Sequence, residues 1–307
     1  MSWPSALASE WTLHVFQMAA QGGVVALLLV PAAAALRRSA PALRSALLSV
    51  ALAKFVLPPM LPFPTGVFSR FAAAPQAFFS RTGLRACAVF AVIHAAGFAV
   101  ALARLAGARR RTRAWLRRSA PYRPPGAGPE VRISRDAAVP CALGGRRPAI
   151  LLPERLVDTL DAVELDAVIR HEREHLARRD PAVTVFEAFV AAFWWFHPAV
   201  RAVLSRRREL REERCDDAVV ACVPPDAYRR ALLSAASLAL PGRFPAVAAT
   251  GPAAELRRRL ERIADPELRS RKRALAAALA VAAAAVLLLP GVHPRVGPGI
   301  PVARISR

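Results

Sequence analysis

The sequence predicts a bundle of four membrane-spanning helices joined to a cytoplasmic α+β domain that is mainly helical. Two observations predict this class: 55% of the 307 residues are hydrophobic, and 44 Lys and Arg against 22 Asp and Glu give a formal charge of +22. Long apolar runs with basic flanks are typical of membrane proteins, and this hydrophobic content excludes a disordered chain. A nucleic-acid-binding role for the basic run 109–118 is disfavoured, because no helix-turn-helix or aromatic-interleaved patch accompanies it.

Four apolar stretches approach the roughly 20 residues that a helix needs to cross the hydrocarbon core. The second is the weakest, because it carries Lys54 and ends in a proline-rich segment. We expect Lys54 either to snorkel toward the headgroups or to face the bundle. The first three stretches would form a membrane domain over residues 1–107. The four predicted spans are about 11–36, 45–63, 86–107 and 273–291.

Orientation follows from the basic residues near the helix ends, because cytoplasmic loops retain positive charge. Arginines follow the first span at 37–44 and the third at 104–118, and basic residues precede the fourth at 269–273. This pattern predicts an external N terminus, a cytoplasmic region from about 108 to 272 and a short external tail over 292–307. We therefore expect a multi-pass protein of the cell inner (plasma) membrane, in contact with anionic lipid.

The cytoplasmic region begins with a basic juxtamembrane segment and linker, 108–129, followed by a folded domain over 130–272. Residues 119–129 are too rich in Pro and Gly to form a long helix or strand. Apolar segments at 139–143 and 148–152 flank Gly144-Gly145. This arrangement predicts a β-hairpin and a small antiparallel sheet.

A capping-box-like pattern over Asp161–Glu164 predicts a helix that begins near Ala162. This helix contains an HExxH pattern, in which His171 and His175 lie one turn apart on one face and can reach a single metal ion. Glu172 is placed to take a proton from a metal-bound water rather than to bind the metal. The alternative, a solvated charged face, leaves the histidine pair unexplained.

A catalytic zinc ion takes three protein ligands and keeps one position open for water. The candidates for the third ligand lie in a second polar helix, which we expect to begin at Pro198. Glu212 and Asp216 share one face of it, and Glu209 and Glu213 share another. Spacing alone leaves both pairs open.

These motifs resemble those of the BlaR/MecR-type integral-membrane zinc peptidases that sense β-lactams, together with their many relatives of unknown signal. The family is marked by a Pro-x-Ile-Leu-Leu-Pro-like strand, HExxH followed by a basic run and Asp, a Trp-Phe-x-Pro corner, and Glu-x-x-Cys-Asp. The matching segments run in order within residues 139–222, at 148–153, 171–180, 195–198 and 212–216. The resemblance implies a gluzincin-like fold and one Zn²⁺ per chain, with Glu212 as the third ligand, Asp180 and Asp216 as supporting residues, and Glu209 and Glu213 as surface charges.

The resemblance also implies a signal-transducing zinc endopeptidase that cleaves a cytosolic protein such as a transcriptional repressor. The expected partners are this protein substrate and membrane lipid, without direct contact to nucleic acid. A homodimer is compatible with the sequence, which leaves the oligomeric state open. Only about 17 residues follow the fourth predicted span. Because β-lactam receptors carry a penicillin-binding domain there, we expect no β-lactam sensing.

Two alternatives come from other classes. The first is a non-catalytic membrane signalling or scaffold protein with a structural metal, against which Glu172 argues, because only catalysis requires it. The second is a membrane quality-control metalloprotease, a group that usually places spans between HExxH and its Glu.

The apolar run 182–196 is expected to be a buried or interfacial helix, since a membrane crossing there would put Glu212 and His175 on opposite sides of the membrane. We expect His197 to cap or pack rather than to be a fourth ligand.

Overall fold

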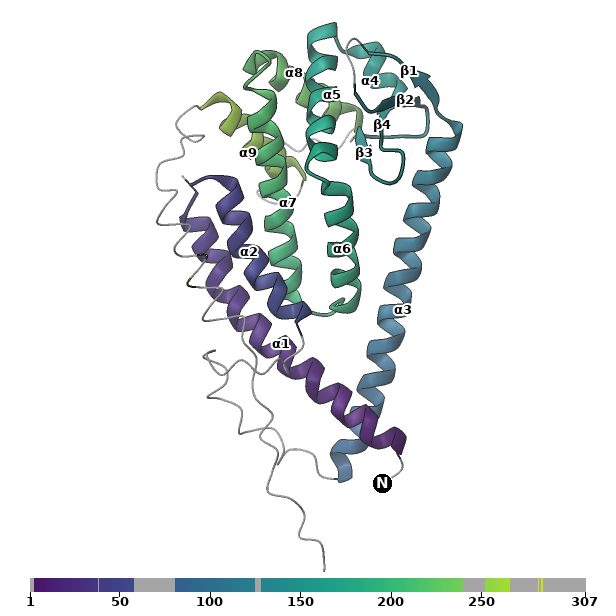
Figure 1. Ribbon diagram of the computed structural model, residues 1–307, viewed down its shortest axis with the longest axis vertical. Helices are drawn as coiled ribbons and strands as arrows, with labels where there is room; N and C mark the ends of the chain where they lie inside the picture. The colour runs from purple at the N-terminus through teal and green to yellow at the C-terminus, as the bar shows by residue number, and fades with distance from the viewer. Residues whose placement is uncertain are drawn as a thin grey trace, which may run out of the picture.

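The computed structural model describes residues 3–37, 39–57, 81–124, 128–239 and 252–265, together with positions 281 and 283. Within these ranges, nine helices and four strands form an elongated molecule. The N terminus lies at one end of this molecule and the strands lie at the other (Figure 1).

Two helices in the described residues are long and apolar enough to cross a membrane. They are α1 (Trp3–Ala35), over His14–Ala35, and α3 (Arg81–Arg118), over Arg85–Arg118. The prediction of four spans is therefore supported for two helices and not for four. The fourth predicted span, apart from positions 281 and 283, the external tail 292–307 and the end of the second predicted span lie outside the described residues.

The second predicted span is a shorter helix than expected. Helix α2 (Pro41–Val56) has 16 residues, a length of about 24 Å at 1.5 Å per residue, which falls short of the roughly 30 Å hydrocarbon core. Its inner face packs against α1. Lys54 is only 3% exposed. Of the two expectations for this side chain, the structure shows that it faces the helices rather than the surface.

The basic segment after the third predicted span is part of one continuous helix, because α3 extends to Arg118. The next residues, expected to lack regular structure, contain strand β1 (Ala120–Tyr122). This strand pairs antiparallel with β2 (Glu130–Ser134) at the edge of the sheet. An edge position tolerates Pro121, which explains why the proline content of this segment did not exclude a strand.

The sheet has the order β1-β2-β4-β3 and ends at the short strand β3 (Cys141–Leu143). β3 and β4 (Ala149–Pro153) pair antiparallel around the glycine turn, which confirms the predicted hairpin. β2 and β4 pair parallel, so the sheet is mixed and not antiparallel as predicted. Gly145 has a φ of 142°, and a Cβ on Gly144 would come within 2.9 Å of Pro181. The turn therefore requires both glycines.

Six helices follow the sheet in the described residues. The first turn of α5 (Ala162–Ala177) carries the predicted capping box: the Asp161 carboxylate accepts hydrogen bonds from two backbone N–H groups, and the Glu164 side chain accepts one from the Asp161 N–H. Helix α7 (Pro198–Val219) begins at Pro198, as predicted. The six helices are α4 (Glu154–Thr159), α5 (Ala162–Ala177), α6 (Asp180–Phe193), α7 (Pro198–Val219), α8 (Pro225–Ala239) and α9 (Pro252–Ala264).

Helix α6 covers most of the apolar run 182–196. With 14 residues it is too short to cross a membrane, as expected for a buried or interfacial helix. Its two faces differ: Val190 and Ala192 are buried, whereas Phe186 and Phe189 are about half exposed.

Helix α5 is held between the sheet and the three C-terminal helices in the described part of the chain. Its apolar side chains pack on strands β2 and β4 and on α8 through a core that contains Val131, Ile150, Leu152, Leu165, Val168, Ile169 and Ala231. Ala167 on another side of α5 joins a second core with α7, α8 and α9. Burying a Val, Leu or Ile side chain contributes about 1.5–3 kcal/mol. These two cores fix the rotation of α5 and leave its HExxH face toward α7.

Candidate active site

The chain turns sharply between the two helices that carry the first site residues. Arg179 adopts the left-handed conformation (φ 58°) between α5 and α6. The turn brings Asp180, at the start of α6, back against His175 near the end of α5, with 2.9 Å between Oδ2 and Nδ1. The side chains of His175 and Asp180, five residues apart in the sequence, thus form a direct hydrogen bond.

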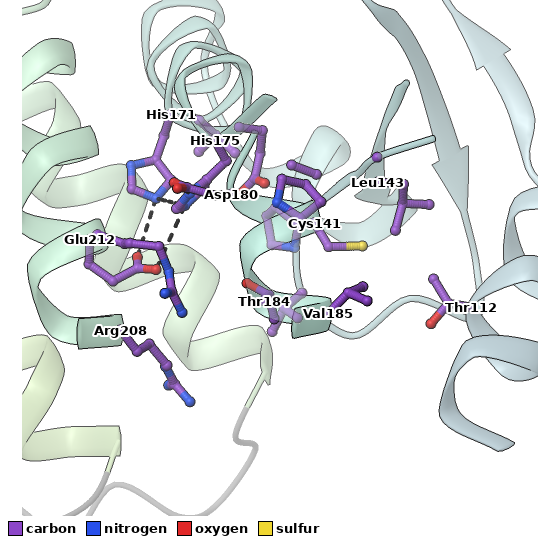
Figure 2. A pocket seen from close by; sticks show the side chains of 18 of the residues that line it. Thr112, Cys141, Leu143, His171, His175, Asp180, Thr184, Val185, Arg208 and Glu212 are labelled. Carbon is purple, nitrogen blue, oxygen red and sulfur yellow. Dashed lines mark hydrogen bonds and ion pairs between the residues drawn. The ribbon is translucent and has the colours of Figure 1, made fainter. Parts of the chain in front are cut away.

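Three candidate ligand atoms converge between α5 and α7, and Figure 2 shows the three side chains turned toward one another. The Nε2 atoms of His171 and His175 lie 3.2 Å apart. The carboxylate of Glu212 places Oε2 at 3.4 Å from His171 Nε2 and Oε1 at 3.7 Å from His175 Nε2. Two ligands at about 2.0–2.1 Å from a tetrahedral zinc ion lie about 3.3 Å apart. The donor set and its spacing therefore fit one metal ion.

The partners of the two histidines leave both Nε2 atoms free to bind that ion. Tyr228 donates its hydroxyl hydrogen to Asp216 (2.6 Å), so its oxygen accepts the Nδ1–H of His171 (2.8 Å). Asp180 accepts the Nδ1–H of His175. A carboxylate or hydroxyl on the outer nitrogen fixes the tautomer and orientation that metal-bound histidines need. Asp180 thus contacts one candidate ligand directly, and Asp216 is connected to the other through Tyr228.

Charges around the site favour a bound cation. Burial works against ionisation of Glu212, but the hydrogen bond with His171 and the charge of Arg259 hold its pKa well below the usual range. Burial also works against protonation of His175, but its hydrogen bonds with Asp180 and Cys215 raise its pKa to about 11. The site therefore combines an ionised carboxylate with surroundings that stabilise a positive charge at His175, whether a proton or a metal ion carries it.

Glu172 lies on the wall of the cavity that contains the candidate ligands, and it is only 7% exposed. Burial raises the pKa of its carboxyl group, while the charges of His171 and His175 lower it. A carboxylate with a raised pKa is better matched to proton transfer near neutral pH than an exposed one. The structure brings together all four residues for which the sequence predicted a role in metal binding or catalysis.

Two further residues at the site were missed by the sequence analysis. Tyr228 of α8 is fully buried between His171 and Asp216. Arg259 of α9 lies 3.0 Å from Glu212 Oε2 and makes two hydrogen bonds to Asp216. Arg259 belongs to a run of three arginines that is indistinguishable in sequence from the other basic segments, so no local signal marks it.

The alternative residues of α7 have other partners. Glu209 pairs with Arg206 and Arg258. Glu209 and Glu213 were expected to be surface charges, and this expectation was wrong, because their side chains are only 21% and 17% exposed. Glu213 pairs with Arg44 of α2 at 2.7 Å. Because α2 packs against this side of α7, the carboxylate next to Glu212 is covered.

His197 lies in the helical bundle and outside the group of candidate ligands. Its ring packs against Phe55 and Trp194, and its Nε2 lies 3.2 Å from the carbonyl oxygen of Ala19. It is also the N-cap residue of α7, although its side chain makes no capping hydrogen bond. The expectation that His197 packs rather than acts as a fourth ligand is confirmed.

The chain is similar to one known family. Residues 69–263, more than half of the chain, match the family described as BlaR1 peptidase M56. No curated protein matches the chain.

Proposed function

The chain belongs to the BlaR1 peptidase M56 family, and on this premise we propose that it is a membrane-embedded zinc endopeptidase that cleaves a cytosolic protein in a regulatory role. As a member of this family it is a metallopeptidase with a His171, His175 and Glu212 group that can hold a metal ion. The observation that carries the proposal is the convergence of two imidazole nitrogens and a carboxylate beside a cavity that also contains Glu172.

Zinc is the metal that this donor set favours. Two histidines and one glutamate are a common ligand set of catalytic zinc, and three protein ligands leave a position open for water. A bound zinc ion would polarise the scissile carbonyl group and lower the pKa of water. We propose one Zn²⁺ per chain at this position.

The residues around the metal would transfer the proton and hold the metal ligands in position. Glu172 takes a proton from the attacking water and passes it to the leaving amine. Asp180 and Tyr228 hold the two imidazoles by their outer nitrogens. Arg259 holds the Glu212 carboxylate toward the histidines. These contacts keep the ligands in place while a substrate enters and leaves.

The substrate backbone would add to the edge of the small sheet. β3 is an edge strand, and all three of its residues line the cavity that contains the HExxH motif. An extended peptide that pairs with a free strand edge gains main-chain hydrogen bonds regardless of its side chains. This position would bring a scissile bond past Glu172, in agreement with an endopeptidase.

The cytosolic location and the repressor are the finer parts of the proposal. Helices α1 and α3 can cross a membrane by length and composition, and the arginine-rich end of α3 leads directly into β1. Because positive charge is retained in the cytoplasm, the site would face the cytosol. A transcriptional repressor as substrate is proposed from the family resemblance.

Metal analysis and peptide hydrolysis test this proposal together. The purified full-length protein should contain about one zinc per chain and cleave members of a quenched-fluorescence peptide library. Removal of the metal by a chelator should abolish cleavage, and added zinc should restore it. A protein that binds zinc but cleaves no peptide or protein would instead support the signalling or scaffold alternative.

A further inference from the structure

We propose that this peptidase selects substrates with acidic side chains near the scissile bond, through four exposed arginines that line its cleft. The four are Arg109 and Arg113 on α3 and Arg146 and Arg147 in the β3–β4 turn. This inference rests on the proposed peptidase function and adds a substrate class to it.

The cleft is a cavity of about 1310 Å³ between α3 and the helices that carry the metal site. One wall is a single stripe of α3, made of residues three or four positions apart, which lie on one face of a helix. Figure 2 shows Thr112 of this stripe across from Glu212, with Cys141, Leu143 and Val185 between them. The α3 residues that line the cleft are Leu105, Arg109, Thr112, Arg113 and Leu116.

Another part of the rim is the turn of the hairpin. Gly144, Gly145, Arg146 and Arg147 line the cleft directly after the edge strand β3. A peptide paired with β3 would therefore pass the two turn arginines at one of its ends. Because successive residues of an extended chain advance about 3.3 Å, its side chains would reach this rim within a few residues of the metal site.

These four arginines differ from the other arginines of the cleft in their partners. Arg208 pairs with Glu255 at 3.1 Å, Arg211 pairs with Glu187 at 2.7 Å, and Arg259 pairs with Glu212 at 3.0 Å. By contrast, the side chains of Arg109, Arg113, Arg146 and Arg147 are exposed. In the described part of the chain, no carboxylate lies within ion-pair distance of them. Their charge is therefore available to a ligand that enters the cleft.

The position of the acidic groups in the cleft restricts where the substrate can carry its own. Glu172, Asp180 and Glu212 all line the metal end. A substrate carboxylate at the scissile bond would be repelled by this group. Glu255 also lines the cleft but is paired with Arg208, so a substrate carboxylate farther from the metal end would meet the unpaired arginines. The charge pattern therefore predicts apolar or small residues at the cleavage site and acidic residues that flank it.

Anionic lipid is the other ligand that exposed arginines near a membrane can bind. Peptide selection and lipid binding would involve different arginines of α3, because lipid headgroups have access to every side of the helix. Arg110 and Arg111 are exposed on the same helix turn but do not line the cleft. Among these four arginines of α3, peptide selection would require only Arg109 and Arg113, which line the cleft. Lipid binding would involve Arg110 and Arg111 equally.

The experiment compares peptides of one sequence that carry Glu, Gln or Lys at the flanking positions. The wild-type protein in neutral detergent should show a kcat/KM that is on the order of tenfold higher for the Glu peptide than for the Gln peptide, and lower again for Lys. This preference should fall as the salt concentration rises. The double variants R109E/R113E and R146E/R147E should each weaken or reverse it. R110E/R111E is the matched control, with the same charge change on the same helix, and should keep the wild-type preference.

Binding separates this inference from the proposed function. The Kd of each fluorescent peptide for the E172Q variant should follow the same order, Glu before Gln before Lys, whether or not the wild-type protein cleaves. Cleavage or binding without charge preference would overturn the inference and leave the proposed function standing. If both α3 double variants lose binding to phosphatidylglycerol vesicles equally and neither changes peptide preference, the arginines bind lipid and the inference is wrong. Acid-selective binding without zinc-dependent cleavage would overturn only the proposed function.

Discussion

A guanidinium nitrogen of Arg259 lies 3.0 Å from Oε2 of Glu212, the same carboxylate oxygen that faces His171. The same side chain makes two hydrogen bonds to Asp216, which in turn accepts a hydrogen bond from Tyr228. Helix α9 therefore contributes to the geometry of a metal site whose candidate ligands all come from α5 and α7. The position of α9 and the affinity for metal should be linked.

Replacing Arg259 should weaken metal binding although the three candidate ligands remain. Loss of a group that orients a ligand typically reduces metal affinity about 10–100-fold. We expect this loss for Arg259→Gln in a competition titration of zinc against a chromogenic chelator. Arg258→Gln is the matched control, because Arg258 lies next to it on α9 and pairs with Glu209 instead. Equal affinities in the two variants would contradict the link.

The choice of Glu212 as the third ligand has its own comparison. Glu212→Ala, like His171→Ala or His175→Ala, should lower zinc occupancy in the purified protein, because each removes one of the three converging atoms. Glu209 lies one turn earlier on the same helix, and the Glu209→Ala variant should bind zinc normally. Metal content measured by mass spectrometry decides between them. Normal zinc content in Glu212→Ala together with loss in Glu209→Ala would assign the ligand to the other face of α7.

Glu172→Gln should separate metal binding from chemistry. The amide keeps the size of the side chain but cannot accept the proton, and general acid–base catalysis contributes about 10²- to 10⁴-fold to rates. We expect normal zinc content and a fall of that order in kcat for peptide cleavage. Cleavage at the wild-type rate would remove Glu172 from the mechanism.

The buried contact between α2 and α7 should contribute to stability. Arg44 is 2% exposed and donates to Glu213 at 2.7 Å and to the Ala33 carbonyl oxygen at 3.1 Å. Removing one partner of a buried ion pair costs about 3–5 kcal/mol. Because Arg262 remains near Glu213, we expect the lower end of this range for Arg44→Met. A lower unfolding temperature in detergent would show it, with Arg37→Met, at an exposed position, as the unchanged control.

The proposed orientation of the chain predicts a pattern of reporter activity. A reporter that is active only in the cytoplasm should work when inserted at residue 125, and one that is active only outside should work at residue 307. This follows from the retention of positive charge in the cytoplasm and from the arginines that precede residue 125 on α3. The opposite pattern would place the site outside the cell and make a cytosolic repressor untenable as a substrate.

Local features of the fold were predictable because they depend on residues a few positions apart. The capping box at Asp161, the start of α7 at Pro198 and the hairpin at Gly144-Gly145 were all predicted and are all present. The spacing of His171 and His175 likewise determines that both lie on one helix face. Each of these is settled by backbone geometry within about one or two turns.

Contacts between distant helices required the tertiary structure. Sequence spacing on α7 left Glu212 and Glu209 open, because the choice depends on how α7 is rotated against α5. That rotation is fixed by packing between α7 and helices far away in sequence, such as α2, which covers Glu213 through Arg44. The role of Arg259 could not be found for the same reason: its three-arginine run has no periodicity of its own, and only the docking of α9 on α7 aims one of the three side chains at Glu212.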